Sequence, residues 1–336
     1  MSKKDIYILG IESSCDDTSV AIVKNGRELV SNVISSQIDI HTLYGGVVPE
    51  IASRNHTKNI RICLEKALAD AKLTMDDINA IAVTYGAGLL GSLIIGVTFA
   101  KSLAYATGKP LYAVNHIEGH IAANYLAYPK LEPPFMCLVV SGGHTALFNQ
   151  NDYCSKKLVC TTSDDAIGEA FDKVARECGL GYPGGPKIQK MAEGGNCNIQ
   201  FVKPYQSIDN FSYSGLKTAV INYMHNKKQK GEILNIPDIC ASFQHQAVNQ
   251  LEVKCRDELL KSGCKKLVLA GGVSANAYLR SNFKKMCDEL GVELFCPSLT
   301  LCTDNAGMIA CQGYYNYING AKPAKLDLAP QSVLKL

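Results

Sequence analysis

Two stretches of the chain share one order of apolar and polar positions. The first has apolar runs at residues 6–11 and 19–23 around the small polar turn ESSCDDT. The second has apolar runs at 135–140 and 146–149 around the polar turn SGGHT. Short apolar runs bounded by polar turns are typical of buried strands, so each stretch predicts a β-hairpin. The two sequences match weakly, but the order of elements is alike and predicts two similar halves.

The rest of the chain alternates between the periods of strands and helices. We expect further strands at 28–34, 80–84, 111–114, 266–270 and 292–296. We expect helices at 49–71, 92–106, 116–126, 166–178, 237–262, 275–290 and 304–319. Such alternation is typical of an α/β fold, and 336 residues exceed the size at which one core stops growing. The predicted lobes are residues 1–132, joined by a C-terminal segment from about 306–336, and residues 133–305.

Composition narrows the function classes. The net charge of +3 is too small to indicate nucleic-acid binding by itself. The 14 cysteines are scattered without any C-x-x-C pair, which favours reduced thiols and a cytoplasmic protein. The apolar run before Glu12 is too short for a secretory signal. The uncharged stretch 78–100 contains four glycines and divides into a strand, a loop and a helix, so no membrane span is expected.

Three glycine pairs follow predicted strands or helices. They lie in SGGHT (141–145), YPGGP (182–186) and LAGGVSAN (269–276). Glycine lets the backbone approach a phosphate closely, and the last motif directs a helix N-terminus at a ligand. None is a Walker loop or a G-x-G-x-x-G motif. The three loops together favour a nucleotide-type ligand, with simple turn formation as the alternative.

Acidic residues gather in SDDAIGEAFDK. At spacings of four and three, Asp165, Glu169 and Asp172 would share one face of a helix. This face is either solvated or offers Asp172 to sugar hydroxyls, because a carboxylate accepts hydrogen bonds from adjacent O–H groups. Glu12 and the other acids of the first turn are equally open to both interpretations.

The segment HIEGH (116–120) places His116 and His120 four residues apart, so both rings of a helix can reach one ion. Glu118 lies about 200° around a helix from this face and cannot be the base of a zinc protease. A third ligand is needed. Asp304, just before the last helix, offers one, unless Thr303 or Asp304 caps that helix. A His-His-Asp set would suit iron or zinc.

The ordered set of motifs resembles one family. It consists of GIESSCDDTSVAIV, GGVVPEIASRNH, NHIEGH, LVVSGGHT, DDAIGEAFDK, YPGGP, LAGGVSAN and CTDNAGMIA. The set resembles the TsaD/Gcp/OSGEP family of tRNA threonylcarbamoyltransferases, in its bacterial TsaD form. The resemblance implies the two-lobed fold of actin, Hsp70 and sugar kinases (ASKHA), with a duplicated β-hairpin-led α/β core and a nucleotide in a central cleft.

The resemblance also implies an activity and its residues. The family transfers the threonylcarbamoyl group from L-threonylcarbamoyl-adenylate to N6 of the adenosine 3′ to the anticodon, at position 37 of tRNAs that read ANN codons, and releases AMP. Its single divalent metal, iron(II) or alternatively zinc(II), is bound at positions matching His116, His120 and Asp304. The matching adenylate-binding residues are Val139, Val140, Ser141, Gly142, Gly143, Asp172, Gly185 and Asn276. Glu12 and Gln189 complete the candidate substrate site, and Gln189 stands where many relatives carry an acidic residue. No general base is assigned.

The partners implied by the resemblance are tRNA, a shorter TsaB-like paralogue that pairs through the N-terminal lobe, and a TsaE-like ATPase, with no membrane. Residues 45–60 are our candidate for part of the pairing surface, with packing inside the lobe as the alternative. Three other functions stay open on the residues alone. They are a small-molecule kinase on the same fold, a non-catalytic nucleotide-sensing subunit and, least favoured, a peptidase.

Overall fold

The chain folds into two compact units, each described here by itself. The structure, a computed structural model, describes residues 5–203 and 208–334. The first unit contains residues up to 133, residues 152–155 and residues from 297 onward; the second contains 134–151 and 156–296. These units differ from the expected lobe boundaries at two places, because residues 152–155 and 297–305 pack with the first unit.

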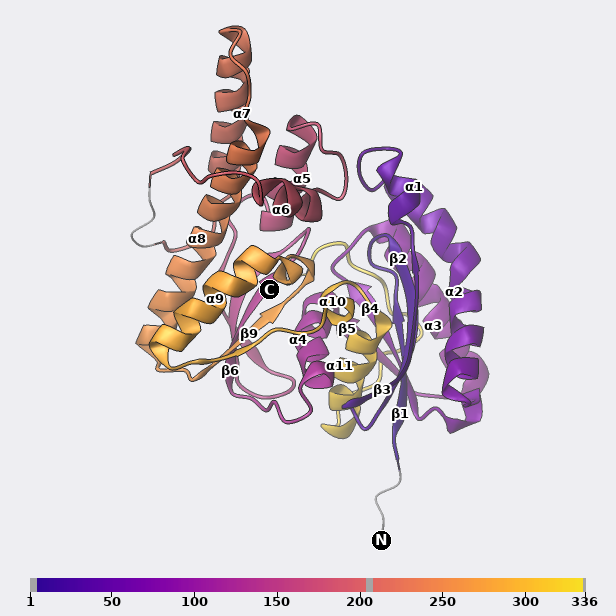
Figure 1. Cartoon of the computed structure of the whole chain (residues 1–336). Helices are drawn as coiled ribbons and strands as arrows, with labels where there is room; N and C mark the ends of the chain where they lie inside the picture. The colour runs from indigo at the N-terminus through magenta and orange to yellow at the C-terminus, as the bar shows by residue number, and fades with distance from the viewer. Residues whose placement is uncertain (1–4, 204–207, 335–336) are drawn as a thin grey trace. The chain divides into compact units, whose positions relative to one another are not determined.

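A five-stranded sheet forms the centre of the first unit (Figure 1). Its order is β3-β2-β1-β4-β5, in which β1, β2 and β3 are antiparallel and β4 and β5 run parallel to β1. The strands are β1 (Tyr7–Glu12), β2 (Asp17–Lys24), β3 (Glu28–Ser36), β4 (Ala80–Gly86) and β5 (Leu111–Asn115).

Helices cover both faces of this sheet. They are α1 (Ile38–Thr42), α2 (Pro49–Ala71), the 3₁₀ helix η1 (Met75–Asp77), α3 (Leu90–Thr107), α4 (His116–Ala127), α10 (Leu299–Cys302) and α11 (Ala306–Ile318). Successive residues of a strand point to opposite faces. Leu9 and Ile11 accordingly join the core formed with α2 and α3, whereas Ile8 joins the core formed with α4 and α11. A Cβ on Gly10 would lie 2.2 Å from the Ala306 oxygen, so α11 packs directly on β1.

The second unit repeats the same sheet. Its strands are β6 (Phe135–Val140), β7 (Thr145–Gln150), β8 (Lys156–Thr161), β9 (Lys266–Ala270) and β10 (Glu293–Phe295). In the order β8-β7-β6-β9-β10, each strand has the pairing of its counterpart in the first unit: a three-stranded antiparallel meander followed by two parallel strands. The predicted duplication of a hairpin-led α/β core is confirmed.

Two α-helices of the second unit were not expected. The full set of helices is α5 (Ile167–Glu177), α6 (Gly184–Ala192), α7 (Ser214–Gln229), α8 (Ile236–Ser262), η2 (Gly272–Ala275) and α9 (Ala277–Leu290). Helices α6 and α7 and strand β8 were not predicted from the sequence. Lys227 and Lys228 lie in the last turn of α7, where the helix dipole interacts favourably with positive charges.

The stretch 78–100 divides as expected into β4, a glycine loop and the start of α3. By length and composition alone, α3 is the one helix among the described residues that could cross a membrane, a test that core helices of soluble proteins also pass. It packs against α2 and β4 within the first unit.

Candidate functional site

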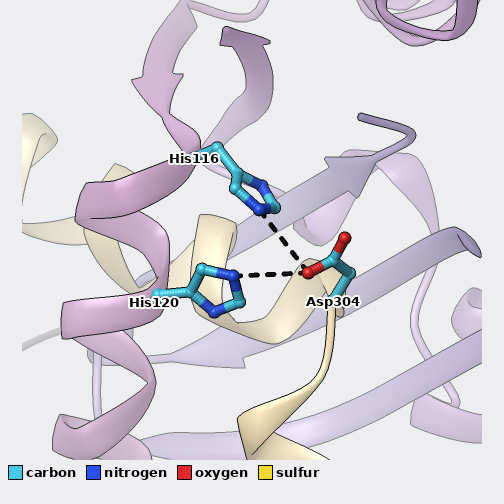
Figure 2. A group of neighbouring side chains, drawn as sticks. All are labelled: His116, His120 and Asp304. Carbon is cyan, nitrogen blue, oxygen red and sulfur yellow. Dashed lines mark ion pairs between the residues drawn. The ribbon is translucent and has the colours of Figure 1, made fainter. Parts of the chain in front are cut away.

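The two histidines are presented by the start of α4. Strand β5 ends at Asn115, whose side chain accepts a hydrogen bond from the Ile117 amide at 2.9 Å and caps the helix. His116 is therefore the first residue of α4, and His120 lies one turn later. Their rings are 4.5 Å apart, and both side chains point toward one carboxylate (Figure 2).

That carboxylate belongs to Asp304, in the loop between α10 and α11. Its Oδ1 lies 3.5 Å from Nε2 of His116 and 3.3 Å from Nε2 of His120. The helix cap is Asn305, which accepts from the Met308 amide at 3.1 Å, so the alternative in which Thr303 or Asp304 caps α11 is wrong. The cap leaves Asp304 available to the histidines, and the three ligand atoms lie within 4.8 Å of one another.

The donor set fits a divalent transition metal. Two imidazole nitrogens and one carboxylate oxygen converge, and such mixed sets bind iron or zinc. Within the described part of the chain, Nε2 of His120 is buried and, although it lies 3.3 Å from Asp304, it makes no hydrogen bond. A buried polar atom left unpaired costs free energy, and a metal ion bound at Nε2 would compensate that cost. Glu118 is outside this cluster, in agreement with its expected direction on the helix.

Behind His116 lies a buried acceptor. The Glu12 side chain, at the end of β1, is fully buried. Its Oε2 is 3.1 Å from Nδ1 of His116 and accepts from the Thr84 hydroxyl at 2.6 Å, and its Oε1 accepts from the Ser14 amide at 2.5 Å. The Glu12 carboxylate is buried against His116 and Thr84, and its contact with a substrate stays a prediction.

These carboxylates determine the charge at His116. Burial alone lowers the pKa of His116, but Asp304 and Glu12 raise it to about 9. Burial raises the pKa of Glu12, yet the His116 charge and hydrogen bond outweigh burial and bring it below its usual value. Burial and the neighbouring His116 lower the pKa of His120. The site thus favours a positive charge at this position, whether a proton or a metal ion supplies it.

The order of parallel strands explains the assembly. Because β4 lies between β1 and β5, the carboxyl ends of three adjacent strands bring Glu12, Thr84 and His116 to one edge of the sheet. Sequence reasoning missed Thr84 and Ser14. The signal was a polar residue near the carboxyl end of a buried strand, within β4 for Thr84 and two residues after β1 for Ser14, which is informative only once the neighbouring strands are known.

In the second unit, the candidate adenylate residues begin at the β6–β7 turn. Val139 and Val140 are fully buried in β6. Ser141 closes the turn through its amide to the His144 oxygen, 2.8 Å, and through its hydroxyl, which accepts from the His144 amide at 3.1 Å. Gly142 and Gly143 are exposed, and a Cβ on either would meet nothing within 4 Å. The backbone of this turn is therefore open to a ligand.

Three other segments pack around this turn or beside it. A Cβ on Gly168, at the start of α5, would lie 2.6 Å from the Ser141 oxygen. Gly271 follows β9 at a φ of +86°, where a Cβ would lie 2.4 Å from the Val140 oxygen. Asp172 accepts from the Gly184 amide at 2.7 Å, which joins α5 to the start of α6 and leaves Gly185 with open space around it. The glycine pairs predicted to bind one ligand thus belong to connected segments of one unit.

Asn276 and Gln189 both accept hydrogen bonds from backbone amides at the start of α9. Asn276 accepts from the Leu279 amide at 2.9 Å and donates to the Gln244 side chain at 2.9 Å. The Gln189 side-chain oxygen accepts from the Ala277 amide at 2.8 Å. Their roles toward a ligand stay predictions, because these bonds already occupy the Asn276 side chain on both sides and the oxygen of Gln189.

The predicted acidic face of α5 is only partly present. Asp165 precedes the helix and pairs with Lys173 and Lys217. Glu169 pairs with Lys173 at 2.7 Å. Of the three acids, Asp172 alone contacts a glycine motif.

In the candidate pairing surface at residues 45–60, Ala52, His56 and Ile60 are buried inside the unit, whereas Glu50 and Lys58 are among the exposed residues. Its role in pairing stays a prediction. Large exposed apolar residues flank this segment. They are Leu43 and Tyr44 before α2, Ile62 on α2, and Leu90 and Ile94 on α3.

Solved structures share the fold at low sequence identity. The component A of (R)-2-hydroxyglutaryl-CoA dehydratase from Acidaminococcus fermentans matches with a TM-score of 0.57 and 14% identity, covering 94% of this chain and all of that one. HypF from T. kodakarensis matches with a TM-score of 0.63 and 14% identity, covering 97% of this chain and 49% of that one. With the duplicated sheets, these neighbours identify the fold as the ASKHA type.

Curated relatives are much closer. A tRNA N6-adenosine threonylcarbamoyltransferase from Clostridium botulinum strain 657 is 51% identical over 99% of both chains. The protein of the same name from Caldicellulosiruptor bescii is 53% identical over 94% of both chains. The family model described as TsaD, tRNA N6-adenosine threonylcarbamoyltransferase, matches residues 28–311. On this evidence of sequence, fold and site, the chain belongs to the TsaD family of tRNA-modifying transferases.

Proposed function

We propose that this chain transfers the threonylcarbamoyl group of L-threonylcarbamoyl-adenylate to N6 of adenosine 37, 3′ to the anticodon of tRNAs that read ANN codons, and releases AMP. The observation that carries the proposal is the convergence of His116, His120 and Asp304 in a chain of this family. Transfer to tRNA follows from the family; the adenylate donor and the target position are the finer steps that we infer.

His116, His120 and Asp304 would hold one divalent ion, iron(II) in first place and zinc(II) as the alternative. When bound, such an ion supplies Lewis-acid polarisation of a carbonyl and a fixed point for substrate oxygens. The burial of both histidines limits water at the site. The leaving group, AMP, is acidic, so its departure requires little proton transfer and we assign no general acid or base.

In the second unit we assign the adenylate to the open backbone of the β6–β7 turn. Gly142 and Gly143 offer exposed amides without a Cβ, which suits a phosphate oxygen. Val139, Val140 and Ser141 shape that turn, and Asp172, Gly185 and Asn276 lie on the segments connected to it. We assign Gln189 to the edge of the same site, where its amide nitrogen can donate to a sugar oxygen.

We also propose the partners. A TsaB-like paralogue would cover the exposed Ile62, Leu90 and Ile94 of α2 and α3, and a TsaE-like ATPase would join that assembly in the cytoplasm. Replacing Ile94 with Asp should then abolish co-elution with the paralogue on gel filtration. Co-elution as strong as that of the wild type would exclude α3 from the interface.

The function is tested by assembling the reaction from purified protein, unmodified tRNA, threonylcarbamoyl-adenylate and the partners, and by measuring the modified nucleoside by mass spectrometry. His116→Ala and Asp304→Asn should each lose bound metal and at least about 100-fold of the transfer rate, because each removes a ligand. Glu118→Gln is the matched control on the same helix, outside the cluster. Unchanged metal content and transfer in both ligand variants would refute the assignment.

A small-molecule kinase was an alternative on this fold, together with a nucleotide-sensing subunit and a peptidase. The family match favours transfer to tRNA over all three. Consumption of ATP with a small alcohol and without tRNA would restore the kinase hypothesis.

A further inference from the structure

We propose that Glu12 is a positioning residue of the metal centre: it accepts the Nδ1 proton of His116 and so presents Nε2 of that ring to the ion. The inference rests on the proposed function in one respect, namely that His116 is a metal ligand. It gives the buried Glu12 carboxylate a role that needs no contact with a substrate.

The Glu12 carboxylate is held in one orientation. It is fully buried, and each of its two oxygens accepts a hydrogen bond from the chain. The donor to Oε1 is the Ser14 amide at 2.5 Å, and the donor to Oε2 is the Thr84 hydroxyl at 2.6 Å. Because these donors come from a turn and a neighbouring strand, the carboxylate cannot rotate without losing both bonds.

His116 lies between two carboxylates. Its Nδ1 is 3.1 Å from Oε2 of Glu12, and its Nε2 is 3.5 Å from Oδ1 of Asp304. An ionised carboxylate can only accept, so a contact at Nδ1 places the proton of the neutral ring there and leaves the lone pair on Nε2. Carboxylates that orient ligand histidines in this way are a general device of metal sites.

The Ser14 hydroxyl is a weaker candidate for the same task. It lies 3.1 Å from the same Nδ1, but a hydroxyl can donate or accept and therefore does not select one tautomer. Its backbone amide is what holds Glu12. Ser14 thus supports the orientation of the pair, while Glu12 decides the position of the proton.

His120 provides the contrast. Its Nε2 also faces Asp304, at 3.3 Å, but its Nδ1 has no hydrogen-bond partner among the described residues. The described residues therefore fix the tautomer of one ligand histidine and give Nδ1 of the other no hydrogen-bond partner. Loss of the Glu12 contact should act on His116 alone.

The test measures zinc affinity by competition with a chromophoric chelator, together with the ¹⁵N chemical shifts of the zinc-loaded histidine rings. Glu12→Gln keeps the shape of the side chain but can place an N–H donor against Nδ1 of His116. We expect a 10- to 100-fold loss of zinc affinity, the usual range for outer-shell substitutions. The wild-type spectrum should show a proton on Nδ1 of His116, and the variant spectrum should lose it.

Two further variants keep the proposal refutable if Glu12→Gln does not fold. Thr84→Val removes the hydroxyl that holds Oε2 and should weaken zinc binding several-fold, whereas Thr84→Ser retains the hydroxyl and should bind like the wild type. Equal zinc affinity in Thr84→Val and Thr84→Ser would overturn the proposal. So would a folded Glu12→Gln variant with wild-type affinity and an unchanged His116 spectrum.

The result is separable from the proposed function. His116→Ala is the reference: if it binds zinc as tightly as the wild type, the metal site itself is wrong and Glu12 has nothing to position. If His116→Ala loses zinc and the Glu12 and Thr84 variants do not, the metal site stands and only the role of Glu12 fails.

Discussion

The two hairpin turns occupy the same position in the two sheets but are built in opposite ways. In the first unit, the turn after β1 is filled by side chains, and Glu12, Ser13 and Ser14 are buried. In the second unit, the turn after β6 contains Gly142 and Gly143, which have no side chains to fill it. Both glycines are exposed, and each has open space where a Cβ would be.

The difference shows how one topology can support two kinds of recognition. A turn rich in carboxylates and hydroxyls can orient a neighbouring side chain such as His116. A turn of glycines leaves its amides free for an anion but can orient nothing by side chains. The duplicated fold thus permits one turn to orient a side chain and the other to leave its backbone open to an anion.

Both turns nevertheless share one support, a glycine from the loop after the neighbouring parallel strand. A Cβ on Gly88, at φ +156°, would lie 2.5 Å from the Ser14 oxygen, and a Cβ on Gly271, at φ +86°, would lie 2.4 Å from the Val140 oxygen. Because both φ values are strained for L-residues and both clashes are with backbone, we expect Gly88→Ala and Gly271→Ala each to cost about 2–4 kcal/mol of stability. Urea unfolding monitored by circular dichroism measures the free energy of unfolding of each variant.

Gly142→Ala is the matched control and should change the free energy of unfolding by less than about 0.5 kcal/mol, since its Cβ would enter open space. A large effect of Gly271→Ala with none of Gly88→Ala would show that the two turns are not supported alike.

The second prediction concerns the carboxylates, which are present in the first turn and absent from the sequence SGGHT of the second. Burial raises the pKa of Asp17 to about 7, against a smaller lowering by Ser36. The folded state therefore binds a proton more tightly than the unfolded chain, and this contribution to stability is present below about pH 4 and is lost as the pH rises through about 7. Asp17→Asn, which cannot ionise, should match the wild type near pH 4 and exceed its free energy of unfolding by up to about 4 kcal/mol at pH 8, since a pKa difference of one corresponds to about 1.4 kcal/mol.

The measurement is thermal unfolding of both proteins across this pH range. Ser141→Ala, in the second turn, which contains no carboxylate, should show no rise in its difference from the wild type between pH 4 and pH 8 of the size expected for Asp17→Asn. A constant difference for Asp17→Asn as well would mean that its carboxylate is ionised throughout.

The third prediction concerns ligand affinity at the open turn. Gly143→Val should place a branched side chain where the adenylate phosphate is assigned and reduce affinity for AMP about 10-fold, which corresponds to about 1.4 kcal/mol. Stability should change little, because a Cβ at Gly143 has open space. Calorimetric titration with AMP measures the affinity of both proteins. Unchanged affinity in the variant would show that the phosphate does not bind at this turn.

The sequence predicted the fold where apolar patterns were continuous. Strands β6 and β9 and helix α2 have the expected limits, since α2 begins at Pro49 and ends before Lys72 in the left-handed conformation. Strand β8 was missed because its charged start, Lys156-Lys157, breaks the apolar pattern. Helix α7 was missed although Leu216, Val220 and Met224 are buried at a spacing of four, a signal that was present.

The candidate site was predictable only in part. The spacing of four identified His116 and His120 as a pair, because helix geometry is local. The place of Asp304 just before the last helix made it a candidate third ligand, and the family resemblance implied the same residue, but its position beside the histidines depends on how α11 packs. The burial of Glu12 and its bond to Thr84 depend on β4 lying beside β1, an order of strands that no local pattern contains.

The position of Asp304 also determines when the site can form during synthesis. His116 and His120 leave the ribosome long before Asp304, and helix α11 follows Asp304 directly. Until α11 arrives, one face of the first sheet lacks its cover, since Ile8, Val23 and Ala82 pack against that helix. A metal site that requires Asp304 is therefore complete only late in synthesis, and the interval before α11 packs is the period in which this apolar face needs protection from aggregation.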